Sequence, residues 1–152
     1  MAVATLNGIA TRYEVLGEGE PLLMFSPGGF DATLEKWSGL GVYAKTKMLG
    51  PLTQQFRCIL FDRRECGQSG GRVQRVTWAD YAAQGLALLD HVGIERAHLM
   101  GGCMGCCPVL TAAVANPERV KSMVLYWPVG GAKYRINGQA RFAQHLGFVA
   151  QQ

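Results

Sequence analysis

The chain has 152 residues, of which 49% are hydrophobic and 17% are charged. This length suits one domain, and the apolar share excludes a disordered or fibrous chain. The formal net charge is +4, and the one loose basic group consists of arginines between positions 57 and 75. Because the other basic residues are dispersed, the composition indicates a solvated basic face and no nucleic-acid partner.

The five cysteines are an odd number, and Cys106 and Cys107 are adjacent, so free thiols fit better than a disulfide framework. Free thiols favour a reducing, cytoplasmic compartment. The first residues lack the basic and apolar regions of a secretion signal. The one membrane candidate, residues 99–115, is 17 residues long and contains glycines and a proline. It is short for a span, so we expect no membrane segment.

The first third of the chain contains three short stretches with strand character. Residues 5–15 predict one or two edge strands, interrupted by Asn7-Gly8. Residues 21–25 predict a buried strand that runs into a glycine loop, and residues 58–61 predict a second buried strand that ends at Asp62.

Thr77, followed three residues later by Asp80, resembles a capping box at the start of a helix. Gly93 provides the stop signal for this helix. Its apolar residues fall mostly on one face, and they are Trp78, Tyr81, Ala82, Leu88, Leu89 and Val92.

Residues 97–100 predict a third strand, followed by glycines and a helix from about Met104 to Asn116-Pro117. Residues 120–127 predict a fourth strand. Continuous apolar strands that alternate with helices indicate the α/β class, with a mostly parallel sheet covered by helices on both faces. Residues 133–152 are weakly amphipathic and predict a further helix.

The segment Gly101-Gly102-Cys103-Met104-Gly105 lies between a predicted strand and a predicted helix. A nucleophile on such a strained turn needs small neighbours, and Gly101 and Gly105 let the backbone segments at the turn pass close to each other. The helix start supplies free N–H groups and the positive end of the helix dipole, which lower the pKa of a thiol. Cys103 is therefore the candidate nucleophile; the alternative is one more buried cysteine at a glycine-rich strand end.

Two segments that carry glycines resemble parts of the α/β-hydrolase superfamily. Residues 99–105 resemble its nucleophile elbow, with cysteine where serine is usual. Phe25-Ser26-Pro27-Gly28-Gly29-Phe30 resembles its H-G-G oxyanion loop, with Pro27 in the usual histidine position.

Two further segments resemble the same family and follow in the family's order. Residues 62–69, DRRECGQS, resemble its D-x-R-G-x-G-x-S loop, with Glu65 at the first glycine. Residues 116–120, NPERV, resemble its H-P-E-R-V entry to a strand, with Asn116 for the histidine.

The resemblance implies an incomplete α/β-hydrolase fold: one domain over residues 1–152, truncated after about the sixth strand, with residues 133–152 as the start of a lid. It also implies an oxyanion hole made of backbone N–H groups, one from Met104 and one from Gly29 or Phe30. Asp62 and Ser69 are expected to hold their loop by turn hydrogen bonds and not to act in catalysis.

The catalytic acid and base of this family follow the nucleophile in the sequence. After Glu118, the remaining 34 residues contain no Asp or Glu, and His145 is the one later histidine. His91 and His98 precede the elbow and are poor candidates for the base. The triad is thus incomplete, which is expected for a fragment, for a natural truncated relative, or for a chain whose base comes from a partner.

The resemblance implies an acyl hydrolase or acyltransferase with Cys103 as nucleophile, a small-molecule ester, thioester or lactone as substrate, and no cofactor or metal. One alternative is a catalytically silent domain. Another is a thiol redox protein that uses Cys103 and Cys106 as a C-x-x-C pair. If the strand at residues 120–127 lacks a neighbour, its open edge also predicts self-association or a homo-oligomer.

Overall fold

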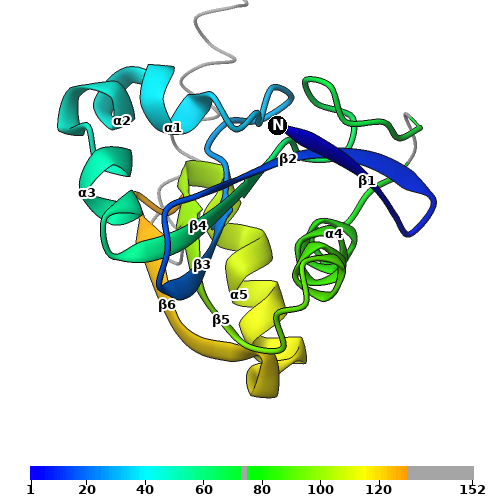
Figure 1. Ribbon diagram of the computed structural model, residues 1–152. Helices are drawn as coiled ribbons and strands as arrows, with labels where there is room; N and C mark the ends of the chain where they lie inside the picture. Colours follow the sequence, from blue (N-terminus) through cyan, green and yellow to red (C-terminus); the bar gives the residue numbers. More distant parts are fainter. Residues whose placement is uncertain (73–74, 130–152) are drawn as a thin grey trace, which may run out of the picture.

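The computed structural model describes residues 1–72 and 75–129. Within these residues, six strands form one sheet in the order β1-β2-β4-β3-β5-β6 (Figure 1). The strands are β1 Ala2–Leu6, β2 Ile9–Leu16, β3 Glu20–Phe25, β4 Phe56–Phe61, β5 Ala97–Gly102 and β6 Val120–Tyr126. The four later strands pair in parallel, whereas β2 pairs antiparallel with both β1 and β4.

Helices cover both faces of the sheet, as the sequence predicts (Figure 1). The helices α4 Trp78–His91 and α5 Cys106–Ala115 lie on one face, and α1 Lys36–Gly39, α2 Gly41–Thr46 and α3 Leu49–Thr53 lie on the other. The three short helices are absent from the sequence prediction. Four to six residues make at most two turns, which is too short for an apolar period to become visible.

Each face of the sheet has its own apolar cluster. The cluster under α4 and α5 is centred on fully buried side chains, among them Leu23, Ile59, Leu88, Leu99 and Val109. The cluster under α1 and α2 contains Leu22, Met24, Leu34, Trp37, Tyr43, Cys58, Leu60 and Met100. Adjacent residues of β3 point to opposite faces, so the continuous apolar run of this strand serves both clusters.

The predicted capping box of α4 is confirmed. The Asp80 N–H donates to the Thr77 hydroxyl at 3.3 Å, and the Thr77 N–H donates to the Asp80 carboxylate at 2.7 Å. The hydrogen bond from Thr77 lowers the pKa of the Asp80 carboxyl. Gly93, with φ of 72°, follows the helix end as predicted.

The boundaries at the elbow and at the last strand differ from the prediction. A 3₁₀ turn, Cys103–Gly105, precedes α5, which therefore begins at Cys106 and not near Met104. The turn is tight because the chain reverses direction directly against β3. Strand β6 ends at Tyr126, and the next residue, Trp127, has a φ of 58°, which lies outside the β region. The helix predicted for residues 133–152 lies outside the described residues.

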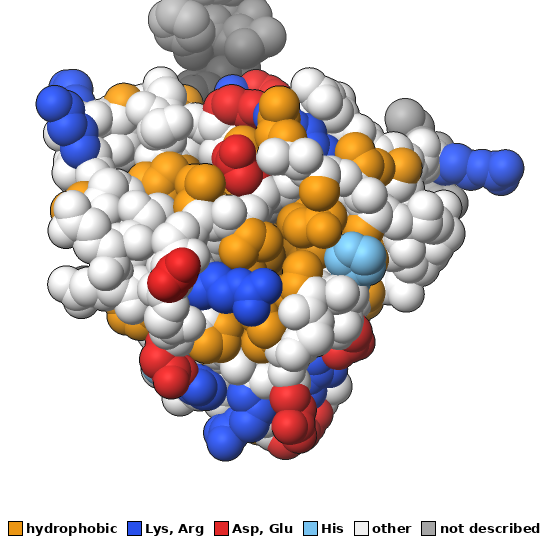
Figure 2. Space-filling model, in the orientation of Figure 1, with side chains coloured by type: hydrophobic (Ala, Val, Ile, Leu, Met, Phe, Trp, Pro, Cys, Tyr) orange, Lys and Arg blue, Asp and Glu red, His pale blue; other side chains and the backbone are white. Residues whose placement is uncertain are grey.

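Within the described part of the chain, no helix is both long and apolar enough to cross a membrane. On the face that Figure 2 shows, acidic and basic side chains are interspersed around a central group of apolar ones. Elsewhere in the described residues, opposite charges form pairs, such as Arg119 with Asp90 at 2.5 Å.

Candidate active site

Cys103 lies at the carboxyl end of β5 with a φ of 52°. Residues with a side chain rarely adopt this left-handed conformation, and it marks either a tight turn or a functional constraint. The preceding strand, β5, is largely buried and is paired on both sides, with β3 and with β6. The turn therefore holds the partly exposed Cys103 thiol at the edge where the parallel strands end.

Backbone from β3 presses directly against the elbow. A side chain on Gly105 would place its Cβ 2.2 Å from the Phe25 carbonyl oxygen and 2.9 Å from that of Ser26. A Cβ on Gly101 would lie 2.5 Å from the Gly105 carbonyl oxygen. Gly102, which the sequence does not single out, would meet the Tyr43 hydroxyl at 2.8 Å. Close packing on three sides thus allows only glycine around Cys103.

The glycine loop after β3 lies beside the elbow. A Cβ on Gly29 would be 3.6 Å from the Met104 sulfur. The carbonyl of Gly29 accepts a hydrogen bond from Arg63, and that of Phe30 accepts one from the Cys66 thiol at 3.4 Å. Neither the Gly29 nor the Phe30 N–H donates a hydrogen bond to another described residue. Both N–H groups thus have no partner in the part of the chain that the structure describes.

The loop at residues 62–69 is organised around Asp62, which is fully buried. Its carboxylate accepts hydrogen bonds from the Leu34 N–H at 2.9 Å, the Gln68 N–H at 2.8 Å and the Arg12 guanidinium at 3.2 Å. The Ser69 hydroxyl donates to the Asp62 carbonyl at 2.8 Å. Asp62 and Ser69 thus fold this loop onto its neighbours.

Glu65 occupies the position where the resembled loop motif has a glycine, and its φ is 65°. Only glycine takes this conformation without strain. The Glu65 N–H donates to the Gly70 carbonyl at 2.8 Å, and its carboxylate pairs with Arg64 at 3.3 Å. These local contacts hold a strained residue in place.

The thiol of Cys106 has a backbone partner of its own. It is buried and donates a hydrogen bond to the Gly101 carbonyl at 3.1 Å. Burial raises its pKa to about 11, so this thiol is protonated at neutral pH and is not itself a nucleophile. Burial likewise raises the pKa of Cys58 to about 11.

The two histidines of the described part have partners away from the elbow. His91 contacts the Tyr13 hydroxyl at 3.3 Å, and His98 contacts the Ser122 hydroxyl at 2.8 Å from the opposite end of β5. His145 lies outside the described residues. Among residues 1–72 and 75–129, no three His, Cys, Asp or Glu side chains are grouped so that they could hold a metal ion.

A pocket of about 400 Å³ opens beside Cys103. It is lined by Cys103 and six other residues, namely Leu40, Val42, Tyr43, Trp127, Pro128 and Val129. The Tyr43 hydroxyl is buried away from solvent, and burial raises the pKa of Tyr43 to about 12, so this group is a neutral phenol. The pocket wall is therefore uncharged.

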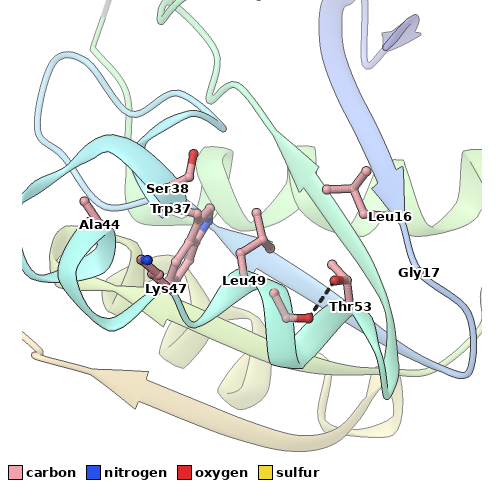
Figure 3. A pocket seen from close by; sticks show the side chains of 9 residues that line it. Leu16, Gly17, Trp37, Ser38, Ala44, Lys47, Leu49 and Thr53 are labelled. Atoms are coloured by element: carbon pink, nitrogen blue, oxygen red, sulfur yellow. Dashed lines mark hydrogen bonds between the residues drawn. The ribbon is translucent and has the colours of Figure 1, made fainter.

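A second pocket, of about 570 Å³, lies on the side of α1 to α3 (Figure 3). Its wall includes Trp37, Lys47 and Leu49, and a hydrogen bond from Thr53 to the Gly50 carbonyl at 2.9 Å closes one side. Cys103 does not line this pocket. We therefore place the candidate chemistry in the smaller pocket.

The family model that matches this chain is the alpha/beta hydrolase fold, over residues 21–133. The chain belongs to this family. Two curated relatives are the dihydrolipoyllysine-residue acetyltransferase component of the acetoin cleaving system of Cupriavidus necator and the 2-hydroxy-6-oxo-6-phenylhexa-2,4-dienoate hydrolase of Comamonas testosteroni. The first is 33% identical over 84% of this chain and 32% of its own length. The second is 35% identical over 82% of this chain and 42% of its own length.

Solved structures show the same fold. A meta-cleavage product hydrolase superimposes with a TM-score of 0.70 and 25% identity, over 85% of this chain and 45% of the other. A bacterial membrane phospholipase A gives a TM-score of 0.73 at 22% identity, over 85% of this chain and 39% of the other. The chain thus spans less than half the length of these relatives.

Proposed function

We propose that Cys103 is the nucleophile of an acyl hydrolase or acyltransferase that acts on small-molecule esters, thioesters or lactones. The observation that carries the proposal is the left-handed Cys103, with φ of 52°, near the glycine loop whose Gly29 and Phe30 N–H groups donate to no other described residue. Both a hydrolase and an acetyltransferase component occur among the curated relatives. This supports a reaction in which the acyl group passes either to water or to another acceptor.

In the proposed reaction, the Cys103 thiolate attacks the carbonyl carbon of the substrate, a C–S bond forms, and the carbonyl oxygen becomes an oxyanion. The N–H groups of Met104 and of Gly29 or Phe30 stabilise that oxyanion. The C–O or C–S bond to the leaving group then breaks, and the leaving group takes up a proton. Water or an acceptor alcohol, thiol or amine finally attacks the acyl–Cys103 thioester and releases the thiol.

The cysteine favours activated substrates. A thiolate leaves the tetrahedral intermediate more readily than an amide nitrogen does, so esters, thioesters and lactones fit the proposed nucleophile better than amides. After Cys103 the sequence contains one carboxylate, Glu118, and one histidine, His145. Because an unassisted thiol has neither a base nor a group to orient it, we expect this 152-residue chain to acylate once and to turn over poorly.

The test is stoichiometric acylation by p-nitrophenyl acetate, followed by release of p-nitrophenol and by intact-protein mass. The wild-type chain should gain one acetyl group at Cys103, with a burst equal to the protein concentration. Cys103→Ala should remove the burst, whereas Cys107→Ala, which alters a neighbouring thiol, should keep it. A burst that survives Cys103→Ala would contradict the assignment of Cys103, and the absence of a burst in the wild type would support the alternative of a catalytically silent domain.

The edge of the sheet supports a proposal on assembly. Among the described residues, β6 pairs with β5 alone, and Met123 and Val124 are 47% and 49% exposed. Such an open, apolar strand edge favours pairing with a second strand. We therefore expect self-association through residues 120–127. Light scattering coupled to size-exclusion chromatography should show an oligomer that Val124→Lys weakens, and a stable monomer at high concentration would contradict this.

A further inference from the structure

The pocket beside Cys103 contains a second strained residue, Trp127. Its φ is 58°, although a bulky side chain disfavours that conformation strongly. Cys103 and Trp127 follow the neighbouring strands β5 and β6, and both line the same pocket. The carboxyl ends of two adjacent parallel strands therefore each carry one left-handed residue toward one cavity.

The exposure of Trp127 is also unusual for so large an apolar side chain. Its exposed fraction is 67%, and its ring contacts the Tyr126 ring with a centroid separation of 6.5 Å. Within residues 1–72 and 75–129, neither burial nor a large packing gain explains why the backbone is held in a strained conformation here. Strain of this kind that persists beside a reactive group indicates a role in function.

The remaining wall of the pocket determines what Trp127 can bind. Leu40 and Val42 from the start of α2, the ring of Tyr43, Pro128 and Val129 surround the thiol, and none is charged. A volume of about 400 Å³ lies in the range of roughly 300–1,000 Å³ found for small-molecule sites. A charged group that entered this wall would lose its hydration without a partner.

We propose that Trp127 is the specificity-determining residue of this site, and that its indole selects substrates whose group next to the reacting carbonyl is uncharged and aromatic or similarly bulky and apolar. The left-handed turn after β6 keeps the indole at the pocket rim, where it stacks on that group while the carbonyl reaches Cys103. This inference deepens the proposed function and relies on it for the reacting atom.

The test uses alkylation of Cys103, which needs a thiol and access but no oxyanion hole. N-benzyl iodoacetamide, iodoacetamide and iodoacetate are compared by peptide mass spectrometry, and each rate is normalised to that of N-acetylcysteine. Burial of the benzyl group should accelerate labelling of the wild-type Cys103 about tenfold over iodoacetamide. Iodoacetate should label Cys103 more slowly than iodoacetamide does.

Three variants separate the role of the indole from a general effect. Trp127→Gly should abolish the benzyl preference and raise the melting temperature, because glycine relieves the strain. Trp127→Phe should retain most of the preference. Trp78→Ala, which removes an exposed tryptophan on α4, should leave it unchanged. If Trp127→Gly does not fold, Trp127→Asn provides the same comparison, since asparagine tolerates a positive φ.

An equal benzyl preference in the wild type and in Trp127→Gly, or no preference in the wild type, would overturn the inference. The outcome is independent of the acylation test. If p-nitrophenyl acetate fails to acylate Cys103 while the benzyl preference depends on Trp127, the proposed function fails and the apolar site stands. If acylation occurs without the preference, the function stands and the role of Trp127 is wrong.

Discussion

The elbow at Cys103 and the loop at residues 62–69 each hold a residue with a side chain in the left-handed conformation. At the elbow, the Phe25 carbonyl of β3 leaves Gly105 no room for a Cβ, and the backbone of Gly105 leaves Gly101 none. In the loop, hydrogen bonds to the buried Asp62 carboxylate hold the chain, and the Glu65 N–H is held by the Gly70 carbonyl. Sterics maintain one strained turn and polar contacts maintain the other.

The two strained residues differ in what the strain achieves. Cys103 presents a thiol to a pocket, so its conformation has a chemical use. The Glu65 carboxylate pairs with Arg64, whose side chain is 10% exposed, and it lines neither of the two pockets described above. A left-handed residue therefore indicates function only when its side chain reaches a cavity or a ligand.

Gly105→Ala should produce the largest effect on stability. The new Cβ would lie 2.2 Å from the Phe25 carbonyl oxygen, and this backbone in the centre of the sheet cannot move away cheaply. We expect a loss of about 3 kcal/mol or more in the free energy of unfolding, measured by urea denaturation. Gly50→Ala in α3, where a Cβ meets nothing within 4 Å, is the matched control and should be neutral or stabilising. Similar stability of the two variants would contradict the steric account.

Asp62→Asn tests the polar account of the loop. The substitution removes the charge that faces Arg12 and places an amide where two backbone N–H groups donate. Breaking a buried ion pair in this way should cost about 3 kcal/mol. Asp31→Asn, whose carboxylate is 69% exposed and pairs with Lys36, should change stability by less than about 1 kcal/mol. A small effect of Asp62→Asn would mean that the loop is held by other contacts.

The thiols of the two regions should differ in reactivity. Cys103 lines a pocket, whereas Cys66 in the loop is 5% exposed and its thiol donates to the Phe30 carbonyl. In limited labelling with iodoacetamide at pH 8, we expect Cys103 to react about tenfold faster than Cys66 or more. Cys58 and Cys106 should stay unlabelled, because pKa values of about 11 keep them protonated at this pH. Faster labelling of Cys66 would refute the assignment of the reactive thiol.

Relief of strain should give the smallest effect and the sharpest contrast. Glu65→Gly and Cys103→Gly each remove a side chain from a left-handed position. Cys103→Gly should stabilise the protein by about 1 kcal/mol, whereas Glu65→Gly should gain less because it also breaks the pair with the largely buried Arg64. Only Cys103→Gly should abolish acylation by p-nitrophenyl acetate, because Cys103 is the proposed nucleophile and Glu65 takes no part in the reaction. A change that relieves strain therefore removes activity at the elbow but not in the loop. Thermal denaturation with the acylation assay measures both, and destabilisation by Cys103→Gly would mean that the elbow is not strained.

Local sequence determined the main elements because their signals lie within a few residues. The apolar runs at β3, β4 and β5 and the Thr77–Asp80 capping box all depend on neighbours in the chain. The four motifs were enough to place the chain in its family, which the match over residues 21–133 confirms. The glycines of the elbow could also be identified in advance, since a strand-to-helix turn has few solutions.

The tertiary structure decided the features that depend on distant segments. The short helices α1 to α3 exist because Trp37 and Tyr43 pack onto the sheet, and four to six residues carry no period of their own. The need for glycine at position 102 comes from Tyr43, and the need at position 105 comes from Phe25, some 60 and 80 residues away in the sequence. The uncharged pocket joins Leu40 and Val42 to Trp127 across the sheet edge. Contacts of this kind follow from how the strands are ordered, and a local pattern of residues carries no information about that order.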